Sequence, residues 1–324
     1  MATPAALTGN LPPRSASRVL YDRLRGGDEI AYLLTLACTV ATLLIVVFLI
    51  GELWFRSQAA IKAFGLSFLF SSTWNPNGDQ FGALPFIYGT CITSFLALLI
   101  AVPFGVASAI FLSEMAPPLL SNIFTFLIEL LAAVPSVIYG LLGVFILVPI
   151  IRLNLVPLLK HTLGFLPLFK GSTFGFSFLS AGLVLSVMIM PFIVSVSREV
   201  LLAVPVEQRE AALALGATKW ETTWQIVLPN AKTGILGSIF LALARALGET
   251  MAVTMVIGNT PVISASLLSP GYSIAAVIAN EFAEANGALY VSSLIFLGLV
   301  LFGLTIVINA IARIFIVMTS RRFG

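Results

Sequence analysis

The chain alternates between long apolar stretches and shorter polar ones, and this pattern predicts a helical membrane protein. A helix needs about 20 mostly apolar residues to cross a hydrocarbon core about 30 Å thick. Strands of a membrane barrel are excluded, because they would show only about 10 residues of alternating character. Six stretches are long enough for a helix: 30–53, 84–112, 121–151, 178–204, 234–258 and 290–318. The sequence therefore predicts an all-α polytopic fold with about six transmembrane helices within residues 30–322.

Three prolines predict bends in two of these helices. Pro103 lies in the second stretch, and Pro135 and Pro149 lie in the third, which is long for a single span. A proline removes a backbone donor and its ring clashes with the preceding turn, so a helix bends or breaks at such a position. We therefore expect the second and third helices to be irregular.

Composition supports the same class of protein. Of the 324 residues, 59% are hydrophobic and 10% are charged, and the mean hydropathy is +1.06. A soluble domain carries about 25% charged residues, so a water-soluble fold is excluded. Cys38 and Cys91 lie in apolar stretches without metal-ligand spacing, and we expect no disulfide, no metal site and no cofactor.

Basic residues indicate the orientation of the chain, because Lys and Arg concentrate in cytoplasmic segments. Arginines recur in residues 1–29, a segment rich in Pro and Ser that we expect to be cytoplasmic and disordered. The apolar run after it is too long for a signal peptide, so we expect an uncleaved first helix. The loop 205–233 and the end of the chain are also basic. Both termini are therefore predicted to be cytoplasmic.

The polar loop between the fourth and fifth stretches is predicted to fold into two short helices. Pro205 suits a first helical turn, and Gly216 can end that helix in a left-handed conformation. Thr218 and Glu221 have the spacing of a capping box that begins a second helix, which Pro229 is expected to stop. The result is a helix–Gly–helix elbow with one apolar side. Such an elbow either packs on its own bundle or docks on a soluble partner.

Two charged residues, Arg245 and Glu249, lie inside the fifth stretch. A charge in mid-membrane costs roughly 2.5–3.5 kcal/mol, and a spacing of four places both side chains on one helix face. Two interpretations stay open. The pair is either a buried ion pair that offsets its own desolvation, or an anion site in which Arg245 supplies charge and donors while Glu249 holds the guanidinium. Glu129, in the third stretch, is expected to be structural.

One pattern in the elbow resembles a known family, the ABC-importer permeases, through their EAA loop. At the spacing of that loop stand Glu210, Ala211, Ala212, Gly216, Ile226, Leu228 and Pro229. In that family the loop forms coupling helices that sit in a cleft of the ATPase subunit, so the resemblance implies this role for the matched residues. The chain has no G-x-x-x-x-G-K-[ST] phosphate loop. ATP hydrolysis is therefore expected from a separate polypeptide, and the chain itself is not expected to be an enzyme.

Three longer segments narrow the resemblance to the permeases of phosphate-specific (Pst) importers. These segments are 81–90, 129–140 and 244–258, and they are more similar to the PstC-type than to the PstA-type subunit. The resemblance implies the type I ABC-importer permease fold, with inorganic phosphate passing Arg245 and Glu249 by alternating access. It also implies a bacterial cytoplasmic membrane, a second permease of the PstA type, two ATPase subunits and an extracytoplasmic phosphate-binding protein.

Two alternative functions stay open at this point. The elbow does not distinguish phosphate from sulfate or molybdate, so another oxyanion ABC importer is the first alternative. An ion-gradient transporter or channel is the second, although such proteins often show helices broken at matched positions, which the sequence does not reveal. A membrane enzyme is not favoured, because no nucleophile–base set appears. Glu281 and Glu284, on the predicted external side, either contact a delivery protein or belong to a solvated face.

Overall fold

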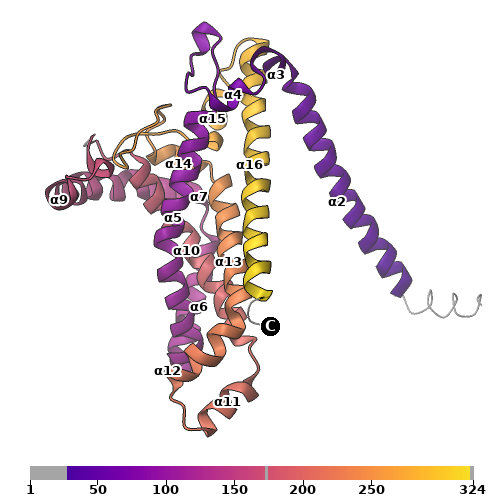
Figure 1. Cartoon of the computed structure of the whole chain (residues 1–324), viewed down its shortest axis with the longest axis vertical. Coiled ribbons are helices and arrows are strands. Elements are labelled where there is room, and N and C mark those ends of the chain that lie inside the picture. Colours follow the sequence, from indigo (N-terminus) through magenta and orange to yellow (C-terminus); the bar gives the residue numbers. More distant parts are fainter. Residues whose placement is uncertain (1–27, 172–173, 322–324) are drawn as a thin grey trace, which may run out of the picture. The chain divides into compact units, whose positions relative to one another are not determined.

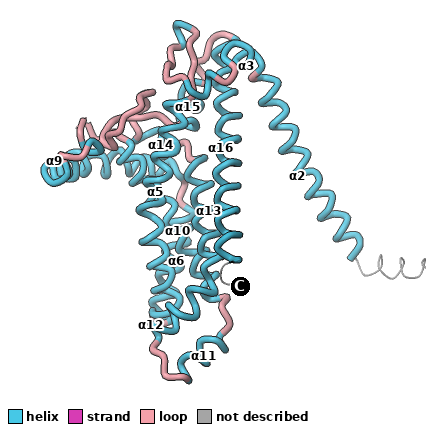
Figure 2. Tube along the Cα trace, viewed as in Figure 1, coloured by secondary structure: helices cyan, strands magenta, loops and turns pink. Residues whose placement is uncertain are grey.

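A computed structural model describes residues 28–171 and 174–321, and helices dominate this part of the chain (Figure 2). The chain divides into two compact units, residues 1–55 and 56–324. The described part of the first unit is covered by one helix, α2 (Asp28–Arg56). The segment predicted to be disordered, 1–29, lies outside the described residues except for its last two positions.

The second unit is a bundle of long helices with short helices at both ends (Figure 1). Along the bundle run α5 (Leu84–Ile110), α6 (Pro118–Ala133), α10 (Phe178–Leu202), α13 (Leu228–Gly248) and α16 (Ala288–Arg321). At one end lie α3 (Gln58–Phe64), α4 (Ser67–Phe70), η1 (Pro76–Gly78) and α15 (Ile274–Glu281). At the other end lie η2 (Phe111–Met115), α11 (Val206–Ala214), α12 (Lys219–Thr222) and η6 (Thr223–Val227).

A further helical segment runs across the bundle instead of along it (Figure 1). It consists of α7 (Ser136–Leu142), η3 (Gly143–Leu147), α8 (Val148–Ile150), η4 (Ile151–Leu155) and α9 (Val156–Leu163), followed by the short η5 (Pro167–Phe169). Its first helix, α7, packs against the short helix α14 (Met251–Val256).

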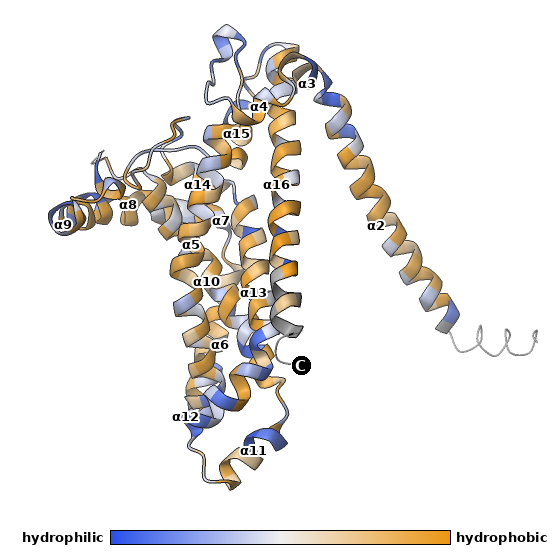
Figure 3. Ribbon diagram, in the orientation of Figure 1, coloured by the Kyte–Doolittle hydropathy of each residue, from blue (hydrophilic) through white to orange (hydrophobic). Residues whose placement is uncertain are grey.

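Six helical segments among the described residues are long and apolar enough to cross a membrane. They are 29–56, 84–115, 136–163, 178–202, 219–248 and 288–314. Within the second unit, apolar residues cover the middle of the bundle, and hydrophilic residues gather at the end that carries α11 and α12 (Figure 3). The second unit therefore has an apolar body between two more polar ends.

Two of the predicted spans are broken; the irregularity at Pro135 was predicted, whereas the break in the fifth stretch corrects the prediction of a continuous helix there. The stretch 121–151 is interrupted at Val134–Pro135, between α6 and α7, because Pro135 has no N–H with which to continue the helix. The stretch 234–258 is interrupted at Glu249–Thr250, between α13 and α14. Each of the other four stretches coincides with a single run of helix.

The pairing of α5 with α10 forms the centre of the bundle. Close approach depends on glycine: a Cβ on Gly182 would lie 2.5 Å from Leu96 Cδ2, and one on Gly105 would lie 2.9 Å from Ile193 Cγ2. On another side, α10 meets α13 through the hydroxyls of Ser197 and Ser238, whose oxygens are 2.8 Å apart. Small residues that allow backbones to approach, together with interhelical hydroxyl bonds, are typical of helix packing in membranes.

Candidate functional site

The elbow lies at one end of the bundle, and its local geometry confirms the predicted helix–Gly–helix form (Figure 1). α11 ends at Ala214, Gly216 just beyond it has φ of +90°, and the N–H of Ala217 donates to the carbonyl of Ala212 at 3.1 Å. The predicted capping box is present as well. The N–H of Thr218 donates to Glu221 Oε2 at 2.8 Å, and the N–H of Glu221 donates to Thr218 Oγ1 at 3.2 Å. Both helix ends are thereby satisfied by the hydrogen bonds that the sequence predicted.

The second arm of the elbow does not stop at Pro229, and the prediction that it would is wrong. α12, η6 and α13 form one continuous helix from Lys219 to Gly248. The π turn η6 directly precedes α13 and shifts the hydrogen-bond register, so Pro229 falls in the first turn of α13, where a missing donor is tolerated. The second arm is therefore a direct extension of α13.

The elbow presents apolar side chains to solvent. Leu215 is 90% exposed, and Trp220 and Trp224 are 55% and 49% exposed, with ring centroids 5.5 Å apart. The two arms are tied together, because Asn230 Nδ2 donates to Gln208 Oε1 at 2.9 Å. Between the arms lies a hollow of about 500 Å³. An exposed apolar patch outside the apolar body of a membrane protein is typical of a protein interaction site.

The seven residues that match the EAA loop are distributed over both arms of the elbow. Ala211, Ala212 and Ile226 line the hollow between the arms. Glu210 is exposed on α11, Leu228 is half-buried, and Gly216 and Pro229 are exposed. A Cβ on Gly216 would meet nothing within 4 Å, so its positive φ, and not lack of space, favours glycine there.

Arg245 lies in the last turn of α13 and points out of the second unit. Its neighbours Ala242, Ala246 and Leu247 are buried in the core, whereas Arg245 is exposed. The nearest preceding charge along the chain is Lys232, about 20 Å away along the helix at 1.5 Å per residue. Arg245 is therefore a cation well inside an apolar region, on a face that the other described residues of the second unit do not cover.

Glu249 does not share a helix face with Arg245, which corrects the sequence prediction. α13 ends at Gly248, and Glu249 has an extended backbone, with ψ of 128°. Its Oε1 accepts a hydrogen bond from the N–H of Ala252 at 3.3 Å, so the carboxylate caps the start of α14. Within the part of the chain that the structure describes, no ion pair joins Glu249 to Arg245.

The two helix breaks are linked through α7 and α14. A Cβ on Gly140 of α7 would lie 2.5 Å from the sulfur of Met255 and 3.2 Å from Cα of Ala252, both on α14. The carbonyl of Leu131 would normally accept from residue 135, which is a proline. The Tyr139 hydroxyl donates to this carbonyl instead, at 2.7 Å. The two helix breaks thus lie side by side; the sequence predicted the irregularity at Pro135 but not the break at Glu249.

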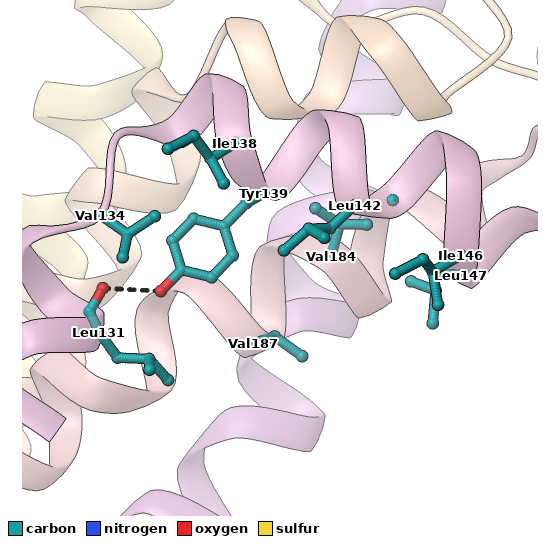
Figure 4. Close-up of a pocket in the computed structure, with 10 residues that line it drawn as sticks. Leu131, Val134, Ile138, Tyr139, Leu142, Ile146, Leu147, Val184 and Val187 are labelled. Carbon is teal, nitrogen blue, oxygen red and sulfur yellow. Dashed lines mark hydrogen bonds between the residues drawn. The ribbon is translucent and has the colours of Figure 1, made fainter. Parts of the chain in front are cut away.

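Tyr139 is a polar residue of this region that the sequence prediction missed. Its side chain is buried, and its hydroxyl bonds to the carbonyl of Leu131. Its sequence signals are its position four residues after Pro135 and its place in the segment 129–140 that carries the family resemblance. Tyr139 also lines a hollow of about 450 Å³ between α6, α7, η3 and α10, whose other lining residues are apolar (Figure 4). In Figure 4 the tyrosine ring lies across the gap left by the α6–α7 break, with its oxygen toward Leu131.

The other acidic residues of the sequence prediction differ in their surroundings. Glu129 is exposed on α6. Glu281 Oε2 accepts from Trp74 Nε1 at 2.9 Å and from the Tyr290 hydroxyl at 2.6 Å, so it joins α15 to α16 and to the segment before α5. Glu284 is exposed beside it. Glu281 is therefore engaged within its own chain, and Glu284 is the carboxylate with free access to solvent.

An aromatic cluster surrounds Glu281 at this end of the bundle. Trp74 contacts Phe81 and Phe86 edge-on, with ring centroids 5.0 Å and 4.8 Å away. Burial raises the pKa of the neighbouring Tyr272 to about 12, so this phenol stays protonated at physiological pH. The cluster and Glu281 together join the loop before α5 to α15 and α16.

Comparison with known proteins assigns the class that the fold and the elbow indicate. Residues 101–322 match the family described as binding-protein-dependent transport system inner membrane component. The chain belongs to this family, and it is a multi-pass membrane transport component. One solved structure, the inward-facing MetNI methionine ABC transporter, has a similar fold, with a TM-score of 0.52 and 16% identity over 72% of this chain and 96% of that one.

Within this family the chain is most usefully compared with proteins named PstC. It is 47% identical to the phosphate transport system permease protein PstC of Xylella fastidiosa, over 98% of this chain and 100% of the relative. It is 49% identical to PstC of Pasteurella multocida, over 84% of this chain and 86% of the relative. The probable PstC of Methanocaldococcus jannaschii is 35% identical over 89% of this chain and 93% of the relative. The predicted resemblance to PstC-type permeases is confirmed.

Proposed function

We propose that this chain is the PstC-type permease subunit of an ATP-driven importer of inorganic phosphate. Support comes from the relatives, which are named as phosphate transport permeases and which match nearly the whole chain. Mid-membrane Arg245 supports an anionic substrate independently. The elbow alone is equally consistent with a sulfate or molybdate importer. The proposal of phosphate as the substrate therefore rests on the relatives.

The elbow is the docking element for a separate ATPase in this proposal. Leu215, Trp220 and Trp224 supply an exposed apolar surface at the end of the bundle, and the residues matched to the EAA loop surround the hollow behind it. Because its second arm continues into α13, a displacement of the elbow tilts or shifts the helix that carries Arg245. The complete assembly would contain two ATPase subunits, one under each permease.

The exposure of Arg245 on the second unit supports a second permease in this proposal. A guanidinium that faces lipid near mid-membrane costs roughly 2.5–3.5 kcal/mol. A guanidinium that faces a polar path between two permeases stays hydrated, avoids this cost and can contact the substrate. Arg245 then presents donors that match the oxygens of phosphate. Glu249 lies at the next helix break and lines the same path. Its charge weakens the field of Arg245, so that phosphate is released, as transport requires.

The proposed location is the bacterial cytoplasmic membrane, with both termini and the elbow in the cytoplasm. The aromatic end with Glu281 and Glu284 then faces outward, toward a phosphate-binding protein that delivers the substrate. Transport proceeds by alternating access: ATP closes the ATPase pair, the elbows move, and the path opens outward. The helix breaks beside Arg245 are where the bundle can bend during this change.

Uptake of radiolabelled phosphate at low external concentration tests the proposal. Cells that lack this permease are complemented with the native chain, with Arg245→Gln, or with Arg152→Gln, which removes the same charge from an exposed position on η4. All three are checked for equal membrane levels. We expect the native chain and Arg152→Gln to restore uptake and Arg245→Gln to fail. Uptake of sulfate or molybdate but not phosphate with the native chain would overturn the choice of substrate.

A further inference from the structure

One side chain of the elbow points away from the docking surface and into the bundle. Arg209 of α11 stands next to Glu210 of the EAA match, yet its side chain is only 17% exposed. It forms an ion pair with Glu114 of η2, whose side chain is 10% exposed, and the two lie 95 positions apart in the sequence. The contact therefore joins the elbow to the end of α5.

The guanidinium of Arg209 has four acceptors on two helix ends. Its Nε donates to Glu114 Oε2 at 3.3 Å, and its Nη2 donates to Glu114 Oε1 at 3.1 Å. The same Nη2 donates to the carbonyl of Leu201 at 2.7 Å, and Nη1 donates to the carbonyl of Val204. Carbonyls at a helix C-terminus lack partners within the helix and carry partial negative charge. Only the planar fork of arginine reaches a carboxylate and two such carbonyls at once.

Three long helices of the bundle differ in how they are connected to the elbow along the chain. α13 is a continuation of the second arm, and α10 is joined to α11 by a short stretch of chain at Pro205. α5 has no such continuity, because α6 and α10 intervene in the sequence. The ion pair between Arg209 and Glu114 thus gives α5 a direct link to the elbow.

From this geometry we infer that Arg209 and Glu114 form a coupling strut, which transmits the motion of α11 to the α5–α10 pair. The inference rests on the proposed function, in which the elbow is moved by an ATPase. α5 and α10 are locked together by the close contacts at Gly105 and Gly182, and α10 packs on α7 and α14 beside the helix breaks. A push on α11 therefore reaches the region of Arg245 through α10 as well as through α13. Without the strut, α11 can move while α5 stays in place.

If Arg209 and Glu114 form a coupling strut, removing it should uncouple ATP hydrolysis from transport. The chain is reconstituted with its permease partner and ATPase in liposomes, with phosphate-binding protein supplied, and phosphate moved per ATP hydrolysed is measured. For Arg209→Gln we expect this ratio to fall about tenfold while hydrolysis continues. Arg209→Lys keeps the charge but lacks the planar fork, so its ratio of phosphate moved to ATP hydrolysed should fall less. The ratio for Glu114→Gln should resemble that for Arg209→Gln. Lys62→Gln, at an exposed position on α3, removes a positive charge far along the chain from the elbow and should leave the ratio unchanged.

A distance measurement separates the strut from a merely structural role. Spin labels are placed on cysteines at Ala214 of α11 and Met115 of η2, with Cys38 and Cys91 replaced by serine. In the native background the distance between the labels should be the same with and without ATP. In Arg209→Gln the distance should differ between the two states. An unchanged phosphate-to-ATP ratio, or a label distance in Arg209→Gln that matches the native one in both states, would overturn the inference. Absence of phosphate transport by the native complex would instead refute the proposed function, while the label distances would still report on the strut.

Discussion

Replacing Tyr139 by phenylalanine isolates one hydrogen bond that repairs a helix break. The hydroxyl donates to the carbonyl of Leu131 at 2.7 Å, an acceptor that Pro135 cannot serve. The substitution removes a single oxygen and keeps the ring that fills the space between α6 and α10. It therefore alters the hydrogen bonding at the break with little change in packing.

The magnitude follows from what remains at the carbonyl after the substitution. Leu131 O still accepts from the N–H of Val134 at 3.1 Å, so it is weakened but not fully unsatisfied. An intramolecular hydrogen bond contributes about 0.5–1.5 kcal/mol net, and side-chain bonds between membrane helices average about 0.6 kcal/mol. We expect a loss of about 1 kcal/mol in the free energy of unfolding, or a fall in Tm of about 2 °C.

Thermal unfolding of the purified chain in detergent measures this loss. Tyr32→Phe is the control, because Tyr32 lies on α2 and its hydroxyl has no hydrogen-bond partner among the described residues. A Tm equal to that of the control would refute the idea that Tyr139 repairs the break. A loss of more than about 3 kcal/mol in the free energy of unfolding would also refute the reasoning. A neutral hydrogen bond to a carbonyl that still accepts another hydrogen bond cannot contribute so much.

Four further substitutions test the elbow and the bundle. Gly216→Ala should cost about 1 kcal/mol through its left-handed backbone, so hydrogen exchange of the α11 amides should speed up and less ATPase should copurify. Thr218→Ala should lose about 1 kcal/mol of capping, seen as faster amide exchange in α12; unchanged exchange would show that the capping box is dispensable. Gly182→Ala should lower the Tm, because its Cβ would meet Leu96 at 2.5 Å. Gly237→Ala meets nothing within 4 Å and should raise the Tm, since alanine favours helix over glycine by about 1 kcal/mol; the same sign for both would contradict the packing argument.

Much of the fold and the elbow followed from local signals in the sequence. The apolar runs predicted where the long helices lie, because lipid demands about 20 apolar residues whatever the tertiary structure. Gly216, Thr218 and Glu221 predicted the elbow correctly, because capping depends on neighbours within five residues. Arg245 was found as a functional candidate for a similar reason, since a charge in an apolar run is conspicuous without a structure.

Local signals identified one of the two helix breaks, at Pro135, and missed the other. Pro135 breaks a helix and Pro229 does not, and the difference is the π turn before Pro229, which leaves no clear mark in composition. The break at Glu249 occurs without any proline, so the sequence prediction carried the helix through it and placed Glu249 on the wrong face. The bond between Arg209 and Glu114 was missed because it joins residues 95 positions apart.

The exposure of the Arg245 side chain on the surface of the second unit has a consequence for the assembly of the subunits. A copy without its proposed partner leaves this guanidinium against lipid, at a cost of roughly 2.5–3.5 kcal/mol, which corresponds to about a hundredfold in a pairing equilibrium. The same residue that would receive the substrate thus favours assembly before any substrate is present. An unpaired copy would be distinguishable from an assembled one by its exposed charge, which gives membrane quality control a feature to recognise.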